Sequence, residues 1–247
     1  MNRRRFISAA AAGAASAMLP AQAATPRIKA VAFDGLALFD PRPIFALAEQ
    51  FFPGRGTALA TAWRVRIFEY SWLRTLTRSY ESFMRIAEDA LVFALAQEKL
   101  VATEAQRRQL LAGFMDLRTW PDVAPVLRRL KAAGLKLAPL THFSVAMLEK
   151  GIANSGLEGV FDHLLSADMV QAYKPDPRAY QMGVDRFGLA PGEIAFVAFG
   201  GWDAAGAKTF GFPTIWINRL NAPAEQLGVA PDAVASSFDA LPAFVGV

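Results

Sequence analysis

The chain of 247 residues contains no cysteine and only two histidines, His142 and His163. The missing cysteines exclude disulfide bridges, thiolate nucleophiles and cysteine-ligated zinc sites. Two histidines are too few for a histidine metal cluster. After residue 25 the sequence also lacks any apolar run long enough to span a bilayer. Carboxylates, lysines, arginines and hydroxyl groups are therefore the main candidates for reactive side chains.

The first 25 residues differ in composition from the rest of the chain. They contain "NRRRF", the alanine-rich run "ISAAAAGAASAML" and then "AQAA". This pattern predicts an export signal, residues 1–25, and it resembles a twin-arginine leader of bacteria. An uncleaved membrane anchor is the alternative, but the run is short and rich in Ala and Gly. We expect cleavage near Ala23 and a periplasmic protein with no stable membrane association after cleavage.

A large excess of positive charge is also absent once this leader is set apart. Three of the 26 basic residues, Arg3, Arg4 and Arg5, lie in it, which leaves 23 basic residues against 22 acidic ones. A nearly neutral chain gains little from long-range attraction to a polyanion. The composition therefore indicates no nucleic-acid partner.

The remaining sequence alternates between short apolar runs and segments of helical length. The apolar runs, which predict buried parallel strands, are "IKAVAF" (28–33), "LKLAPL" (135–140), "HLLS" (163–166), "IAFVAF" (194–199) and "PTIWI" (213–217). Helical patterns are predicted at 121–134, 144–156, 176–188 and 202–211. This alternation is typical of an α/β fold with a doubly wound parallel sheet.

A long helical stretch interrupts the alternation after the first predicted strand. Helical periodicity occupies 58–76, 80–97 and 104–117, with no strand candidate among them. We predict a helical cap domain at 43–118 and a core domain formed by 27–42 and 119–247. Because the insertion follows the first strand, the cap should lie over the carboxyl edge of the sheet, where open α/β sheets bind ligands.

Polar side chains follow several of the predicted strands. Asp34 ends the first apolar run, Thr141 and His142 follow the second, and Lys174 and Asp203 come later near the same predicted edge. Each alone has a structural explanation, such as turn or helix capping or a solvated lysine. Together, two carboxylates and a lysine predict a nucleophile, a charge-stabilising cation and a group that orients water.

Three long segments carry a family resemblance. "FPGRGTALATAWRVRIFEYSWLRTLTRSYESF" lies in the cap, "FDHLLSADMVQAYKPDPRAY" contains the lysine, and "WDAAGAKTFGFPTIWINR" contains the second carboxylate. With these segments the chain after the leader resembles the type II 2-haloacid dehalogenases of the haloacid dehalogenase superfamily. The resemblance implies a Rossmann-like core with a helical cap, a homodimer, no cofactor and no required metal. It also implies hydrolysis of short 2-haloalkanoic acids, with the S configuration, to 2-hydroxy acids and halide.

The same resemblance implies roles for the core residues by position. Asp34 matches the nucleophile that forms an ester with the substrate, and Asp203 matches the acid that positions the hydrolytic water. Lys174 and Tyr180, in "YKPDPRAY", match the lysine and tyrosine beside the nucleophile. Thr141 stands where the family has a serine that binds the substrate carboxylate.

The remaining implied residues belong to the halide pocket. Arg64, in "AWRVR", matches the cap arginine that receives the departing halide. Phe83 and Trp202 match aromatic residues of that pocket, and His142 replaces an asparagine beside it. The other cap aromatic residues, Trp63, Phe68, Tyr70 and Trp72, have near-helical spacing and are interpreted as mainly core residues.

The chain departs from the family pattern in its loops. The family's first loop usually reads D-x-Y-G-T-L-F-D, whereas Asp34 to Asp40 is one residue shorter and lacks the Tyr and the Thr. The fourth loop usually offers S-S-N, but Ala198, Phe199 and Gly200 stand there. The residues for ester formation are therefore retained, while side chains that commonly support ester hydrolysis are missing.

These departures leave two alternatives. The first is a decayed dehalogenase that binds a small carboxylate without turnover, which the missing polar groups favour. The second is a phosphatase on the same scaffold, which would need D-x-D at the first strand, although position 36 is Leu36.

Overall fold

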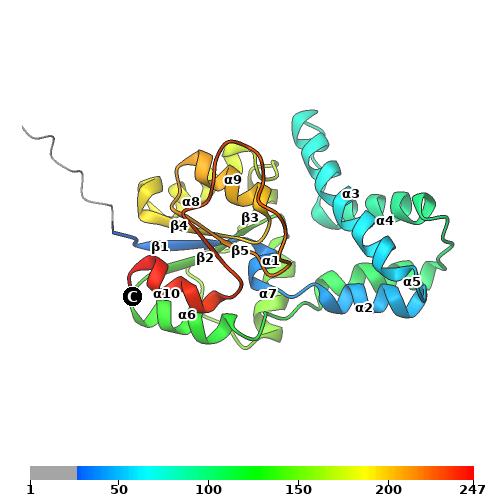
Figure 1. The fold of residues 1–247 in the computed structure, drawn as a ribbon, viewed down its shortest axis with the longest axis horizontal. Coiled ribbons are helices and arrows are strands. Elements are labelled where there is room, and N and C mark those ends of the chain that lie inside the picture. The colour runs from blue at the N-terminus through cyan, green and yellow to red at the C-terminus, as the bar shows by residue number, and fades with distance from the viewer. Residues whose placement is uncertain (1–26) are drawn as a thin grey trace, which may run out of the picture.

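The computed structural model describes residues 27–247, and the predicted leader lies outside them. A six-stranded sheet lies at the centre of the core, in the order β3-β2-β1-β4-β5-β6, with every neighbouring pair parallel. The strands are β1 (Ala30–Phe33), β2 (Lys136–Thr141), β3 (Leu165–Ser166), β4 (Ile194–Ala198), β5 (Thr214–Ile217) and β6 (Ala233–Ala235). Helices flank this sheet (Figure 1), which confirms the predicted doubly wound α/β fold.

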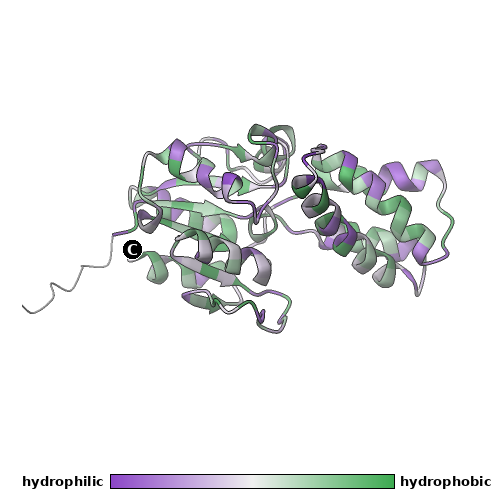
Figure 2. Ribbon diagram, turned by 90° about the horizontal axis from the view of Figure 1, so that it is seen from above, coloured by the Kyte–Doolittle hydropathy of each residue, from purple (hydrophilic) through white to green (hydrophobic). Residues whose placement is uncertain are grey.

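The central strand β1 is apolar because both of its faces are covered. Val31 and Phe33 point into one hydrophobic cluster, and Ala30 and Ala32 point into another. All four residues are completely buried, as expected for a parallel strand with helices on both sides. Figure 2 shows the strands mostly as hydrophobic residues and the helices as mixtures of polar and hydrophobic residues.

The four core helices of ten residues or more all lie where the sequence predicts helices. They are α6 (Val123–Ala132), α7 (Val145–Asn154), α8 (Pro177–Phe187) and α9 (Gly201–Phe210). Three short elements lack a clear sequence signal: α1 (Gly35–Leu38), α10 (Leu241–Val245) and the edge strand β6. The predicted strand 163–166 is shorter than expected, since only Leu165–Ser166 pairs with β2.

Four helices form the body beside the core in Figure 1: α2 (Arg42–Phe51), α3 (Gly56–Leu76), α4 (Phe83–Gln97) and α5 (Glu104–Ala112). The pair α3 and α4 is joined through Trp63, whose Nε1 donates to the backbone oxygen of Ala87 at 2.7 Å. Phe83 and Phe114 pack edge to face with centroids 5.2 Å apart. No helix among residues 27–247 has the length and apolar character needed to cross a membrane.

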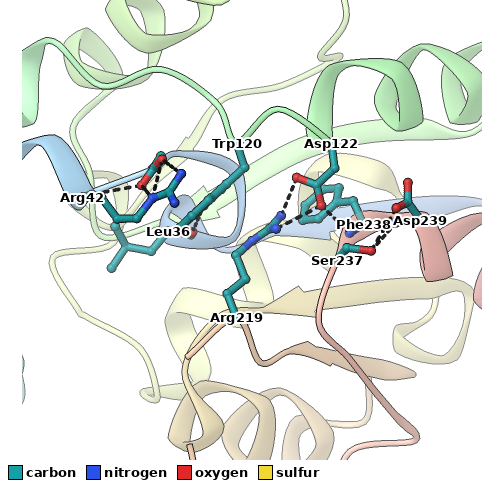
Figure 3. Close-up of polar contacts among 9 residues, drawn as sticks. Leu36, Arg42, Trp120, Asp122, Arg219, Ser237, Phe238 and Asp239 are labelled. Carbon is teal, nitrogen blue, oxygen red and sulfur yellow. Dashed lines mark hydrogen bonds and ion pairs between the residues drawn. The ribbon is translucent and has the colours of Figure 1, made fainter. Parts of the chain in front are cut away.

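A cluster around Trp120 holds the two chain segments that connect core and cap (Figure 3). An isolated antiparallel β-bridge between Phe39 and Thr119 joins the segment that leaves the core for the cap to the segment that returns from it. The guanidinium groups of Arg42 and Arg219 lie 4.6 and 4.5 Å from the Trp120 ring centroid. The contact with Arg219 is the stronger one, because this arginine and Trp120 are largely shielded from water, whereas the Arg42 side chain is 65% exposed.

The carboxylate of Asp122 fixes one of these arginines. It accepts hydrogen bonds from Arg219 Nη2 at 2.9 Å and Nη1 at 3.0 Å, and from the backbone N–H of Phe238 at 2.8 Å. Burial raises the pKa of Asp122, but the Arg219 and Phe238 hydrogen bonds outweigh burial and hold it below the ordinary value. Asp122 therefore contributes stability above pH 4, which is lost as the pH falls through its depressed folded-state pKa.

We predict that Asp122→Asn lowers the free energy of unfolding by about 1–3 kcal/mol, because charged hydrogen bonds to a mostly buried arginine are lost. Urea unfolding monitored by circular dichroism measures this change. Glu88→Gln is the control, since its pair with Arg85 is exposed and 3.6 Å long and such surface pairs contribute little. Equal unfolding midpoints for Asp122→Asn and the wild type would contradict the assignment.

Candidate active site

A buried lysine lies at the centre of the candidate site. The Nζ of Lys174 donates to Asp34 Oδ1 at 2.7 Å and to Asp203 Oδ2 at 2.5 Å. Only 1% of the lysine side chain is exposed. Burial lowers the pKa of Lys174, but the charges of Asp203 and Asp34 outweigh burial and raise it above its ordinary value. The lysine is therefore a permanent cation that holds the two carboxylates together.

Asp34 joins this charged group to the neighbouring cavity. It follows β1 directly and caps α1, because its Oδ2 accepts from the backbone N–H of Leu36 at 3.0 Å. Its other oxygen accepts from Lys174. The side chain is 14% exposed and lines the cavity. The capping role and the predicted nucleophilic role are thus compatible in one carboxylate.

Asp203, in the first turn of α9, lies behind Lys174 and is fully buried. Its Oδ1 accepts from the hydroxyl of Tyr180 at 2.7 Å, and its Oδ2 accepts from Lys174. Burial is the main cause that raises the pKa of Asp203 to about 6; Lys174 opposes the rise and Asp34 adds to it. Asp203, Tyr180 and Lys174 do not line the cavity. They form a second layer that supports Asp34 from behind.

The cavity has a volume of about 310 Å³ and lies between the core and the cap. Its wall is mainly aromatic, with contributions from Trp63, Phe68, Trp72, Phe83, Phe143 and Trp202. Among residues 27–247, Arg64 on α3 is the only cationic side chain in the wall, and its guanidinium forms no ion pair or hydrogen bond with those residues. An apolar cavity with one unpaired cation suits a small anion or a departing halide.

The two polar residues after β2 are placed differently. Thr141 is buried, and its Oγ1 accepts from the backbone N–H of Phe143 at 3.3 Å. His142 lies among Phe68, Tyr173 and Trp202, with ring centroids 6.2, 4.7 and 6.0 Å away. Both of these polar residues line the cavity.

The structure therefore divides the predicted site residues into two groups. The cavity wall contains Asp34, Arg64, Phe83, Thr141, His142 and Trp202. Lys174, Tyr180 and Asp203 form the buried layer behind Asp34. Within residues 27–247, no group of three or more histidine, aspartate and glutamate side chains is arranged to hold a metal ion.

Three cap aromatic residues interpreted as core residues line the cavity: Trp63, which also belongs to the hydrophobic core, and Phe68 and Trp72. Phe68 packs edge to face on Trp202 with centroids 5.1 Å apart, and Trp72 does so at 5.4 Å. Trp72 Nε1 also donates to the backbone oxygen of Lys174 at 3.2 Å. Helical spacing alone could not identify them, because a helix between a core and a cavity is apolar on both sides.

The loop after β5 also lines the cavity, although no sequence signal marked it. Asn218, Leu220, Ala222 and Glu225 contribute to the wall. The side chain of Glu225 lies against Gly201, where an added Cβ would be 2.9 Å from its Cγ. The sequence contains no motif in this loop that would distinguish it from an ordinary connection.

Comparisons with known proteins agree with this geometry. A family model for haloacid dehalogenase-like hydrolases matches residues 7–211. The chain is 40% identical over 215 residues to the (S)-2-haloacid dehalogenase of Pseudomonas sp. (strain YL), covering 87% of this chain and 93% of that one. A phosphatase from Thermococcus onnurineus is 24% identical with a TM-score of 0.58, covering 89% of this chain and 98% of its own, which shows the fold alone.

Solved structures give the same result. The L-2-haloacid dehalogenase RSc1362 has a TM-score of 0.86 and 40% identity, covering 90% of this chain and all of its own. The L-2-haloacid dehalogenase of Xanthobacter autotrophicus with chloropropionic acid covalently bound has a TM-score of 0.81 and 32% identity, covering 89% of this chain and 98% of its own. On these grounds the chain belongs to the family of haloacid dehalogenase-like hydrolases.

Proposed function

We propose that this protein hydrolyses short (S)-2-haloalkanoic acids to 2-hydroxy acids and halide. The observation that carries the proposal is the Asp34 carboxylate, held by Lys174 at one oxygen and exposed to an aromatic cavity that contains Arg64. The printed names of the similar proteins, (S)-2-haloacid dehalogenase and L-2-haloacid dehalogenase, support this substrate class.

The first step is a displacement by the nucleophile. An oxygen of Asp34 attacks the carbon that bears the halogen, and the carbon–halogen bond breaks with its electron pair leaving on the halide. A carboxylate is a better nucleophile when fixed protein groups replace its water shell. Arg64 receives the halide, because a guanidinium is itself weakly hydrated and suits a weakly hydrated anion.

The second step is hydrolysis of the ester. Water attacks Cγ of Asp34, and the former carboxylate oxygen leaves with the product as its hydroxyl. The backbone N–H of Leu36 and the Nζ of Lys174 are the donors already aimed at the Asp34 oxygens, at 3.0 and 2.7 Å. Such donors stabilise the oxyanion that forms during attack.

Binding without turnover is the second candidate function. The observation in its favour is that Asp203, the predicted water-positioning acid, does not line the cavity, and that Ala198, Phe199 and Gly200 offer no polar side chain there. Steady-state halide release above one equivalent per chain excludes it. The phosphatase alternative is weaker, because Leu36 leaves no second carboxylate two residues after Asp34 to protonate a leaving group.

The substitution Asp34→Asn should lower halide release from (S)-2-chloropropionate by several orders of magnitude, because a neutral amide is a far weaker nucleophile than a carboxylate. A halide-selective electrode measures the rate, with fluoro-, chloro- and bromoacetate as further substrates. Asp40→Asn is the matched control, since Asp40 belongs to the same loop but pairs with Arg42 away from the cavity. Equal loss in both variants would count against a nucleophilic role.

Turnover in heavy-oxygen water identifies the attacking group in the wild-type protein. Under single-turnover conditions, mass spectrometry should find one heavy oxygen in the peptide that contains Asp34. The product hydroxyl should carry the enzyme's original oxygen. Heavy oxygen appearing directly in the first product would mean that water attacks the substrate.

The homodimer is part of the proposal, and exposed apolar residues of the cap support it. Val65, Leu73 and Leu76 lie along one face of α3, and Val92 on α4 is also half exposed. Patches of this kind commonly mark protein interfaces. We predict that Leu76→Lys converts a dimer to a monomer in light scattering, while Val101→Lys, at an exposed loop position, leaves the mass unchanged. A monomeric wild type would refute the dimer.

Export to the periplasm is likewise proposed from the leader pattern, since "RRRF" and "AQAA" frame an alanine-rich run. Expression in a bacterium with the twin-arginine pathway should yield a periplasmic protein that begins near Ala24. N-terminal sequencing of that fraction provides the measurement. A periplasmic form that still begins at Met1 would disprove cleavage, and a wholly cytoplasmic product would disprove export.

A further inference from the structure

The loop that follows the nucleophile has no polar side chain of its own. All five residues between Asp34 and Asp40, from Gly35 to Phe39, are apolar, so none of their side chains can bind the peptide groups of the loop. The loop forms the single turn of α1, and the last carbonyl groups of a helix have no partner within it. The position of this loop therefore depends on donors from other parts of the chain.

Trp120, in the segment that returns from the cap, supplies two of these donors. Its Nε1 donates to the backbone oxygen of Leu36 and its backbone N–H donates to that of Leu38, both at 3.0 Å. The backbone N–H of Leu36 in turn donates to Asp34 Oδ2 at 3.0 Å. Leu36 is thus held on one side by Trp120 and bonded on the other side to the nucleophile.

The ring of Trp120 is fixed by contacts outside the loop. It lies between the guanidinium groups of Arg42 and Arg219 (Figure 3), at 4.6 and 4.5 Å from its centroid. Asp122 holds Arg219 in place through two hydrogen bonds. On the cavity side, Phe199 stacks on Trp120 with centroids 6.4 Å apart. Only 6% of Trp120 is exposed, so its indole N–H has a defined direction toward Leu36.

We propose that Trp120 is a positioning residue for ester hydrolysis, which holds Leu36 so that its N–H points at the carboxyl group of Asp34. Trp120 touches no reacting atom and acts only through Leu36. The assignment rests on the proposed function, because it needs an Asp34 ester.

The negative charge on the Asp34 oxygens changes in opposite directions in the two steps. In ester formation it leaves these oxygens for the halide, so a donor to them gives that step no advantage. In hydrolysis the water oxygen bonds to Cγ and the carbonyl electron pair moves onto its oxygen. The return of this pair breaks the bond from Cγ to the ester oxygen. One water proton ends on the product hydroxyl, and the other leaves when the carboxyl group ionises again.

Negative charge therefore develops first on the carbonyl oxygen of the ester and then on the ester oxygen. The Leu36 N–H donates to one of these two oxygens, whichever of them formed the ester. A donor that meets charge only as it develops stabilises the transition state more than the ground state. Weakening the support of Leu36 should therefore slow hydrolysis and spare ester formation.

The variant Trp120→Phe removes the indole N–H and keeps an aromatic ring beside the two arginines. Rapid-quench single turnovers with (S)-2-chloropropionate, followed by intact-protein mass spectrometry, measure the two steps separately. Ester formation should stay within about 2-fold of the wild type, whereas hydrolysis should slow by about 10-fold or more, because a misplaced donor loses much of its effect. Once hydrolysis limits turnover, kcat and KM should fall together and leave kcat/KM unchanged.

A second variant and a control separate this role from packing. Trp120→benzothienylalanine keeps the shape of the ring and replaces only the N–H by sulfur, so it should slow hydrolysis in the same way without loss of folding. Phe187→Leu trims a buried aromatic side chain at the end of α8, outside the site. It should lower the unfolding temperature and hydrolyse the ester at the wild-type rate.

Hydrolysis at the wild-type rate in both Trp120 variants would overturn the proposal. Equal slowing of the two steps would also overturn it, as would slowed hydrolysis in Phe187→Leu, because either result would indicate a general loss of site structure. If the wild type forms no ester and releases no halide, the proposed function itself fails. An ester in the wild type with normal hydrolysis in the Trp120 variants removes only the role of Trp120.

Discussion

One buried ammonium group between two carboxylates organises the whole site. Removing these three charges from water costs several kcal/mol for each ion, and the loss is offset only when each charge keeps close partners. The contacts of Lys174 with Asp34 and Asp203, at 2.7 and 2.5 Å, provide them. Because the partners follow β1 and β4 and the lysine precedes α8, the sheet must bring three distant segments to one edge. The charge cluster can therefore form only in this fold, and the fold in turn requires that the cluster be complete.

The cluster also explains why the cavity is so apolar. Lys174 and Asp203 are held in a layer behind the wall, so that Asp34 alone presents the cluster to the cavity. The wall around it consists mainly of aromatic side chains, and its other charged residues among residues 27–247 are Arg64 and Glu69 on α3 and Glu225 in the loop after β5. An anionic substrate that enters would lose its hydration, and fixed donors must replace it. The charged groups of the site therefore lie behind the nucleophile, on α3 of the cap and at Glu225, and the surface between them is mainly apolar.

Much of this arrangement could be predicted from the sequence, for identifiable reasons. Fully buried parallel strands have continuous apolar runs, so β1, β2, β4 and β5 were apparent, and polar residues at their ends indicated the functional edge. The edge strand β6 was missed because it is three residues long and Val234 within it is exposed. Proximity along an edge also does not tell which side chains reach a cavity. Asp203 and His142 both follow strands and both are buried, yet only the tertiary packing shows that His142 lines the cavity and Asp203 does not.

The cap contacts the charge cluster directly through a hydrogen bond and aromatic packing. Trp72 of α3 donates to the backbone oxygen of Lys174 and packs on Trp202 at the start of α9. Any movement of α3 away from the core would break this hydrogen bond and admit water beside Asp34. Water around Asp34 would restore its hydration and weaken both its nucleophilicity and its attraction to Lys174. The aromatic residues of the cap therefore act on the chemistry by excluding water. This role explains why the wall has large apolar side chains, where a site for a small polar acid would otherwise need hydrogen-bonding groups.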